Sequence, residues 1–312
     1  MTSSSSTSSS RRCGPVRPLG VGWVAAVILL ATVALNAGVA RYVEQPPDVV
    51  TAKIRGYRAR PPGPHIVSFG SCHGDAFVPQ AVEAAWGAGV RVINVSFKNT
   101  EPMEWALIFR RYIEEDPDLV GVAVVFANTE LRIAANPWEE QVMGLASWGD
   151  IPLLARVGCK TFGCAGELVL RRAWPAYRQR GYLSARVWHS VGVRPPSLPP
   201  GSPKPGKSES SWFDGTPDPY VWARAFLAEA HRRDIPAWFI PLAPNPEFPP
   251  ADKDLASLAV IREGGGVVLD IAVDPPLTAA DYKDDRHLKD ASQPRMAQAI
   301  GKALRVRMPT GR

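Results

Sequence analysis

Short apolar runs alternate with amphipathic helical patterns from about residue 64 onward. Five runs have the length and composition of strands, at 66–69, 90–95, 119–127, 237–242 and 266–270. The third is almost continuously apolar, which is typical of a strand buried on both faces of a sheet. Apolar positions at helical spacing follow these runs, at 79–86, 101–114, 220–233, 254–263 and 293–304. The alternation predicts a three-layer α/β fold in which helices flank a parallel sheet.

The pattern loosens between the third and fourth predicted strands. Helical spacing continues to about residue 180, and a stretch rich in Pro, Gly and Ser follows at 193–219. We interpret 129–219 as a loop-rich insert within a single domain that spans 64–312. Ligands of parallel sheets bind at the carboxyl ends of the strands, so polar residues just beyond those ends are the first candidates for chemistry.

The N-terminal region has a different pattern. Residues 18–40 contain no charged side chain. About 20 apolar residues span a bilayer, whereas a cleaved signal peptide has an apolar core of about 7–15, so the run predicts one retained transmembrane helix. A cleaved signal is the alternative, because 36–40 is rich in small residues. Three arginines precede the run, and the positive-inside rule then places the tail, 1–17, in the cytoplasm.

This orientation predicts a single-pass protein of the cytoplasmic membrane with its main domain outside. The tail is a low-complexity Ser/Thr segment that we expect to be disordered, and 41–63 is predicted to be a Pro-rich linker. The formal net charge is +6, and part of it lies around 53–60. No nucleic-acid-binding motif accompanies these cations, which argues against nucleic acid and favours proximity to anionic lipid or cell-wall polymer.

The four cysteines divide by position. Cys13 lies in the tail. Cys159 and Cys164 bracket a four-residue loop, and they are either a disulfide formed in an oxidising compartment or two unrelated thiols. Cys72 is left without a partner. An unpaired cysteine in an exported domain is a candidate reactive thiol.

Two distant segments contain the residue types of a catalytic triad. The first predicted strand ends at Gly70-Ser71-Cys72-His73-Gly74, and an Asp284-x-x-His287 motif lies more than 200 residues later. A nucleophile at a strand-to-helix turn, with a distant His to accept its proton and an Asp to orient that His, is triad chemistry. The structural alternative is that Cys72 is a small buried apolar residue at a strand end.

These motifs resemble those of the SGNH/GDSL hydrolase superfamily, in particular its membrane-anchored branch that takes part in acylation of cell-envelope polysaccharides. The Gly-x-Ser of the first family block aligns with Gly70-Ser71-Cys72, which places Cys72 at the nucleophile position. Asn128 matches the Asn of the third block, and Asp284 with His287 matches the last block. The Gly of the second block is missing near 96–99. The resemblance spans about 64–305 and implies a flavodoxin-like sheet.

The resemblance also implies a role for each residue. Cys72 would attack an acyl carbonyl, His287 would act as base, and Asp284 would orient His287. The Asn128 amide and the Cys72 backbone N–H would stabilise the oxyanion. Ser71 is the alternative nucleophile if the turn is shifted by one residue. No cofactor or metal is expected, since the acidic residues at 281–290 fit no calcium loop.

The function predicted from these features is that of an extracytoplasmic esterase or acyltransferase. Its substrate would be an acyl ester, for example of an envelope polysaccharide, and a membrane-bound O-acyltransferase is the implied partner. The alternative is a catalytically silent protein of the same fold that binds glycan or serves as a scaffold in an envelope acylation complex. The missing Gly and the Cys in place of Ser both favour that alternative.

Overall fold

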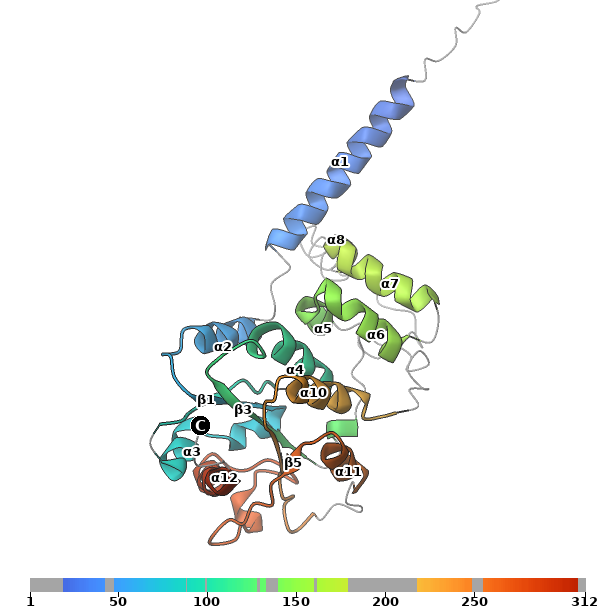
Figure 1. Cartoon of the computed structure of the whole chain (residues 1–312). Coiled ribbons are helices and arrows are strands. Elements are labelled where there is room, and N and C mark those ends of the chain that lie inside the picture. Colours follow the sequence, from blue (N-terminus) through green and yellow to red (C-terminus); the bar gives the residue numbers. More distant parts are fainter. Residues whose placement is uncertain are drawn as a thin grey trace, which may run out of the picture.

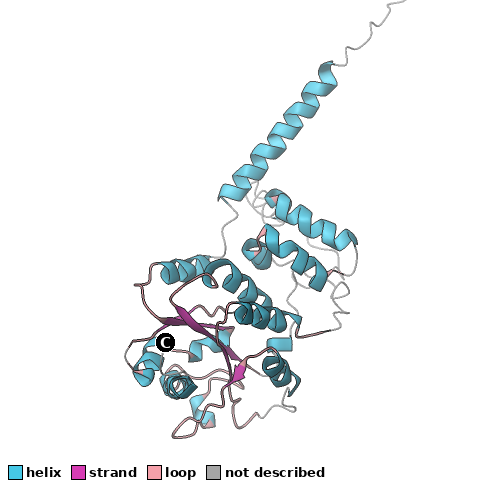
Figure 2. Ribbon diagram, in the orientation of Figure 1, coloured by secondary structure: helices cyan, strands magenta, loops and turns pink. Residues whose placement is uncertain are grey.

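The computed structural model describes residues 19–42, 48–87, 89–98, 100–127, 130–132, 140–159, 162–178, 218–248 and 255–307. At its centre is a five-stranded sheet in the order β2-β1-β3-β4-β5, and every neighbouring pair of strands is parallel. This is the flavodoxin-like order, and it confirms the predicted α/β class. Figure 2 shows the strands enclosed by helices. The strands are β1 (His65–Gly70), β2 (Arg91–Asn94), β3 (Leu119–Phe126), β4 (Ala237–Pro241) and β5 (Val267–Val268).

Alternation of side chains along the strands divides the core into two layers. In β1, Val67 and Phe69 face one hydrophobic cluster while Ile66 faces the other. In β4, Phe239 and Trp238 divide in the same way. Successive side chains of a strand point to opposite faces, so a sheet with both faces covered needs apolar residues at nearly every position.

Helices cover both faces of the sheet (Figure 1). On one side α3 (Pro79–Trp86) packs against α12 (Gln293–Arg307), and their buried side chains form one core layer. The other layer contains side chains from α2, α4, α10 and α11. These helices are α2 (Asp48–Arg58), α4 (Pro102–Ile108), α10 (Val221–Arg232) and α11 (Leu255–Glu263).

Helix α2 corrects the prediction of a linker over 41–63. Its Val50, Ile54 and Tyr57 are buried in the core. Their spacing of four and three residues is that of one helical face. The prolines that flank this segment on both sides dominate its composition and conceal the short amphipathic helix between them.

Two predicted elements differ from the observed ones in extent. The helix predicted over 101–114 ends its regular α-helical part at Ile108 and continues as a π-helical turn, Phe109–Ile113. The strand predicted over 266–270 is reduced to Val267–Val268 at the sheet edge, although Leu269 N–H still donates to Phe239 O at 2.8 Å. Short edge strands are common, because a long one would offer unpaired backbone groups to other chains.

The described part of the insert is helical. It contains α5 (Glu140–Leu145), α6 (Ile151–Gly158), α7 (Phe162–Ala173) and α8 (Pro175–Arg178). A disulfide joins Cys159 to Cys164, with a Cα–Cα distance of 5.4 Å, so the disulfide interpretation of this pair is confirmed. The Pro-, Gly- and Ser-rich stretch up to residue 217 lies outside the described residues.

Helix α1 (Leu19–Tyr42) extends away from the domain on the side of α8 (Figure 1). Near its C-terminal end, the Asn36 side chain donates to Ala173 O at 3.4 Å and accepts from Ala176 N–H at 3.2 Å. Several of its apolar side chains, such as Trp23 and Leu30, are exposed. Among the residues that the structure describes, no helix combines the length and apolarity needed to cross a membrane. The tail, 1–17, lies outside the described residues.

Candidate active site

The candidate site lies at the carboxyl ends of β1 and β3, where the strand order changes direction. Ser71, Cys72 and His73 follow β1 directly, and Glu130 follows β3. A Cβ at Gly70, the last residue of β1, would lie 2.7 Å from Val125 O of the neighbouring strand. Glycine at this position therefore allows the backbone to turn close against β3 and brings Cys72 to the mouth of the crevice.

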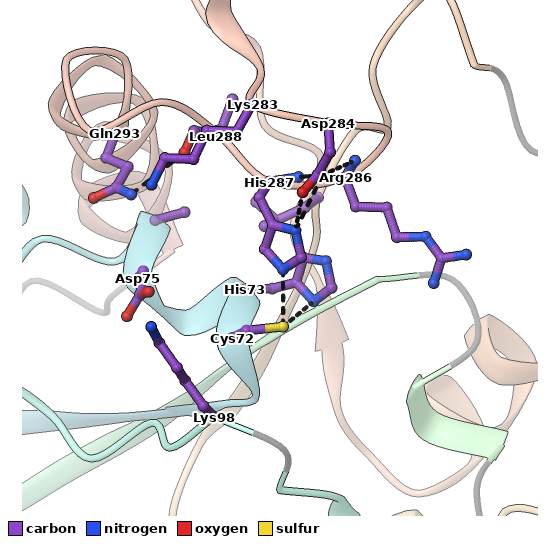
Figure 3. A pocket seen from close by; sticks show the side chains of 12 residues that line it. Cys72, His73, Asp75, Lys98, Lys283, Asp284, Arg286, His287, Leu288 and Gln293 are labelled. Atoms are coloured by element: carbon purple, nitrogen blue, oxygen red, sulfur yellow. Dashed lines mark hydrogen bonds and ion pairs between the residues drawn. The ribbon is translucent and has the colours of Figure 1, made fainter.

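Cys72, His287 and Asp284 form a continuous chain of contacts (Figure 3). Cys72 Sγ lies 2.9 Å from His287 Nε2. On the other side of the imidazole, His287 Nδ1 lies 2.9 Å from Asp284 Oδ2 and 3.0 Å from Oδ1. This order of atoms is the one that a nucleophile, a base and an orienting carboxylate require. The structure thus brings together three residues that the sequence assigned to one triad.

Asp284 is held in its ionised form by backbone donors. The N–H groups of His287 and Arg286 donate to Oδ1 at 2.7 and 2.9 Å. These two bonds, with the His287 side chain, lower the pKa of Asp284 to about 2. The carboxylate is consequently charged at neutral pH and favours the proton of His287 on Nδ1, so Nε2 presents its lone pair to the thiol.

Contacts with the chain after β4 fix the Asp284–His287 loop. Asn245 Nδ2 donates to Asp284 O at 3.0 Å, and the Tyr282 hydroxyl donates to Ala243 O at 2.9 Å. Within the loop, Lys283 N–H donates to His287 O at 2.7 Å. Asn245 lies in the segment that follows β4, and its role here is to position the loop that carries His287.

Ser71 has a different set of partners. Its hydroxyl forms a short hydrogen bond to Glu130 Oε1 and lies 3.3 Å from His73 Nδ1. The base His287 contacts Cys72 instead. The geometry therefore favours Cys72 over Ser71 as the nucleophile, as the register of the motif predicts.

His73 and Glu130 are two residues of the site outside the predicted set: the sequence favours His73 as no more than a polar residue at the mouth of the site, and it does not indicate Glu130 at all. His73 Nδ1 lies 2.7 Å from Glu130 Oε1, and their side chains are only 4% and 13% exposed. The His73 ring stacks on the His287 ring, with centroids 4.9 Å apart and an angle of 5° between planes. Figure 3 shows the two rings lying over each other beside the Cys72 sulfur. The Ala127 N–H, three residues before Glu130, donates to Glu130 Oε2 at 2.8 Å, as in a capping motif. This spacing is a sequence signal for Glu130 that can be recognised only once the structure is known.

A pocket of about 220 Å³ opens at the thiol. Apolar contacts come from Ala76, Leu242 and Leu288. Lys98, Lys283 and Arg286 bring positive charge to its lining, and Asp75 brings negative charge. The volume is below the 300–1,000 Å³ of typical pockets for drug-sized ligands, so it suits a small group.

Of the two predicted oxyanion donors, the Asn128 amide and the Cys72 backbone N–H, the structure describes one. Asn128 lies outside the described residues. Cys72 begins a 3-10 helix, Cys72–Ala76, and the first N–H groups of a helix lack partners within it, which leaves the Cys72 N–H as a candidate donor.

Three potential metal-ligand atoms, on Cys72, His73 and His287, lie within 4.8 Å of one another. An ion bound by two imidazoles must lie near the plane of both rings. The two histidine rings are stacked with parallel planes, so their lone pairs do not converge on one point. In this arrangement the cluster is suited to proton transfer rather than to holding an ion.

No family model matches the chain, and a search of curated proteins finds no match. Among solved structures, a crystal structure of TesA is similar, with 11% sequence identity and a TM-score of 0.38, covering 77% of this chain and 97% of that chain. Likeness at this level carries no argument about activity, which has to come from the geometry of the site.

Proposed function

We propose that the protein is an SGNH-like acyl hydrolase or acyltransferase that uses Cys72 as its nucleophile. The observation that carries the proposal is the line of contacts from Cys72 Sγ through His287 to Asp284, with 2.9 Å at each step. Proton transfer requires a base within hydrogen-bond reach of the proton that it removes, and this arrangement satisfies the requirement without substrate present.

The proposed reaction has two halves. His287 Nε2 takes the thiol proton, and the thiolate attacks the acyl carbonyl, whose oxygen becomes an oxyanion next to the Cys72 N–H. The intermediate collapses to a thioester as the alcohol leaves with the proton from His287. Water or an acceptor alcohol then gives its proton to His287 and attacks the thioester, which releases the acid or a new ester and returns the proton to Cys72.

We propose a short acyl group as the transferred unit. The volume of about 220 Å³ leaves room for a small acyl chain against Ala76, Leu242 and Leu288. Lys98 and Asp75 at the same pocket would contact a polar alcohol or sugar portion. An ester of an envelope polysaccharide has both features, a short acyl group on a polar carrier.

We further propose that the domain is exported and attached to the cytoplasmic membrane through residues 18–40, with the tail inside. The uncharged run at 18–40, the exposed apolar side chains of α1 and the Cys159–Cys164 disulfide support this location. A membrane-bound O-acyltransferase is the proposed partner, because it could supply the acyl group to a tethered domain.

The test of the proposed function is turnover of activated esters with acyl chains of increasing length. We expect the full chain to hydrolyse acetyl and propionyl esters, and to lose rate steeply for longer chains, because the pocket cannot admit them. The Cys72→Ala variant serves as the background control. If the wild type hydrolyses none of the esters faster than Cys72→Ala does, the result favours a catalytically silent scaffold protein over an enzyme.

A further inference from the structure

His73 and Glu130 form a second histidine–carboxylate pair beside the proposed triad. His73 follows Cys72 in the chain, and Glu130 comes from the segment after β3. The pair is buried, unlike His287 and Asp284, whose side chains are 36% and 49% exposed. A buried carboxylate needs donors to offset its desolvation, and Glu130 has three, from Ser71, His73 and the Ala127 N–H.

The hydrogen bonds of Glu130 determine which nitrogen of His73 carries a proton. A carboxylate only accepts, so Nδ1, at 2.7 Å, donates to Oε1. His73 Nε2 is buried and has no hydrogen-bond partner among the described residues. In a ring that carries its proton on Nδ1 alone, this atom is a lone pair, so no buried N–H donor is left without an acceptor.

We propose that His73 is a positioning residue that acts as a neutral ring stacked on His287 and stabilises the imidazolium formed when His287 takes the proton of Cys72. The inference rests on the proposed function. The centroid distance of 4.9 Å and the interplanar angle of 5° place the π face of one ring over the other. A cation over an aromatic face is stabilised electrostatically, and more so when the pair is shielded from water. Glu130 then acts through His73, by fixing its tautomer and ring orientation.

The other charged groups near His73 and His287 do not stabilise the His287 imidazolium in this way. Asp284 contacts the far nitrogen of His287. The remaining charges at the pocket are Asp75, Lys98, Lys283 and Arg286, of which Lys283 pairs with Asp290 and Arg286 with Asp285. His73 is the group whose ring stacks on His287. Its removal should therefore destabilise the thiolate–imidazolium pair more than removal of one of the charged side chains that line the pocket.

The test is the pH profile of alkylation of Cys72 in the full chain, followed by mass spectrometry on the peptide that contains Cys72. His73→Ala should shift the midpoint of the profile to higher pH by roughly one unit, a tenfold change in the equilibrium between thiol and ion pair. His73→Phe retains a neutral stacked ring and should keep the midpoint near that of the wild type. Glu130→Gln, which keeps the ring but weakens its anchor, should give a smaller shift in the same direction.

The control is His231→Ala, an exposed histidine on α10, which should leave the profile unchanged. A shift to lower pH in His73→Ala would mean that His73 is a cation that repels the imidazolium, and this result overturns the proposal, as does no shift at all. Alkylation needs no ester turnover, so failure of this inference is distinguishable from failure of the proposed function. Circular dichroism of each variant separates local from global effects.

Discussion

At the scale of single residues, the proposed triad predicts strongly non-additive mutations. Cys72→Ala and His287→Ala should each reduce hydrolysis of an activated short acyl ester by roughly 10³-fold or more, because nucleophile and base act as one unit. The double variant should lose little beyond either single one. The measurement is kcat/KM for the wild type and the three variants. Independent, multiplying losses would show that the two residues do not share a step.

Ser71→Ala is the matched control at the neighbouring position. The Ser71 hydroxyl bonds to Glu130 rather than to His287, so its loss should cost far less than the loss of Cys72. If Ser71→Ala abolishes turnover while Cys72→Ala is tolerated, the nucleophile is shifted by one residue.

Some residues of the site could be predicted from the sequence, and others could not. Cys72, Asp284 and His287 could be predicted, because each lies in a short motif whose spacing has a chemical meaning. Glu130 could not, since 57 residues separate it from His73 and only the sheet brings them together. Asn245 acts through a long-range hydrogen bond to a backbone carbonyl, which no local pattern encodes. Sequence motifs therefore predicted the three residues of the proposed triad but not Glu130 and Asn245, whose partners are distant in the chain.

At the scale of elements, the sheet was largely predictable and the irregular elements were not. Periodicity predicts α3 to the residue and β3 within one residue, because apolar spacing is unambiguous where burial is complete. It does not predict the π-helical turn Phe109–Ile113, because a single wider turn of five residues is too short to change the period of the whole segment. The core helix α2 was also missed, because eleven residues between prolines resemble a linker.

Gly70 is predicted to be necessary for the placement of the nucleophile. In Gly70→Ala the new methyl group would meet Val125 O at 2.7 Å, a backbone atom that cannot rotate away. The strand end must then shift, at a cost of about 1–3 kcal/mol in the free energy of unfolding. Chemical denaturation measures this cost, and kcat should fall as well, because Cys72 lies two residues further on. Gly166→Ala, with open space around its Cβ, is the control.

The contact between Glu114, which follows the π-helical turn after α4, and Glu229 of α10 is predicted to depend on pH. Burial, with a hydrogen bond and repulsion from Glu229, raises the pKa of Glu114 from its ordinary value of 4.5 to about 7. A raised carboxyl pKa gives stability that is complete below the unfolded-state value and is lost as the pH rises through the folded-state value. Compared with Glu114→Gln, the wild type should therefore lose thermal stability between about pH 5 and pH 7.

Melting temperatures across this pH range test the prediction, with Glu115→Gln as the control. Glu115 is next in the chain, and its side chain is 84% exposed. Parallel curves for the wild type and Glu114→Gln would show that folding does not raise the pKa of Glu114.

At the scale of the whole molecule, the arrangement of α1 relative to the domain leads to a prediction about topology. If residues 18–40 anchor the chain with its tail inside, a C-terminal fusion to a reporter that is active only outside the cytoplasm will be active, and the full-length protein will be in the membrane fraction. The Cys159–Cys164 disulfide should then be intact in protein purified without reductant. A silent reporter in a membrane-bound fusion would contradict the proposed orientation.

The composition of 18–40 indicated where a helix would form, and α1 occupies that segment. Composition does not indicate the contact of Asn36 with α8, which joins α1 to the helical insert. Contacts between segments 140 residues apart depend on the final packing, and periodicity within either segment contains no information about them.

The central claim, that Cys72 is an acyl-accepting nucleophile, is tested most directly by trapping the covalent intermediate. The full chain is mixed with an activated short acyl ester, quenched in acid within the first turnover, and digested for mass spectrometry. The account predicts one acyl group on the peptide that contains Cys72, released by hydroxylamine as expected for a thioester, and strongly reduced in His287→Ala. An acyl group on Ser71, or equal labelling of Cys72 with and without His287, would contradict it.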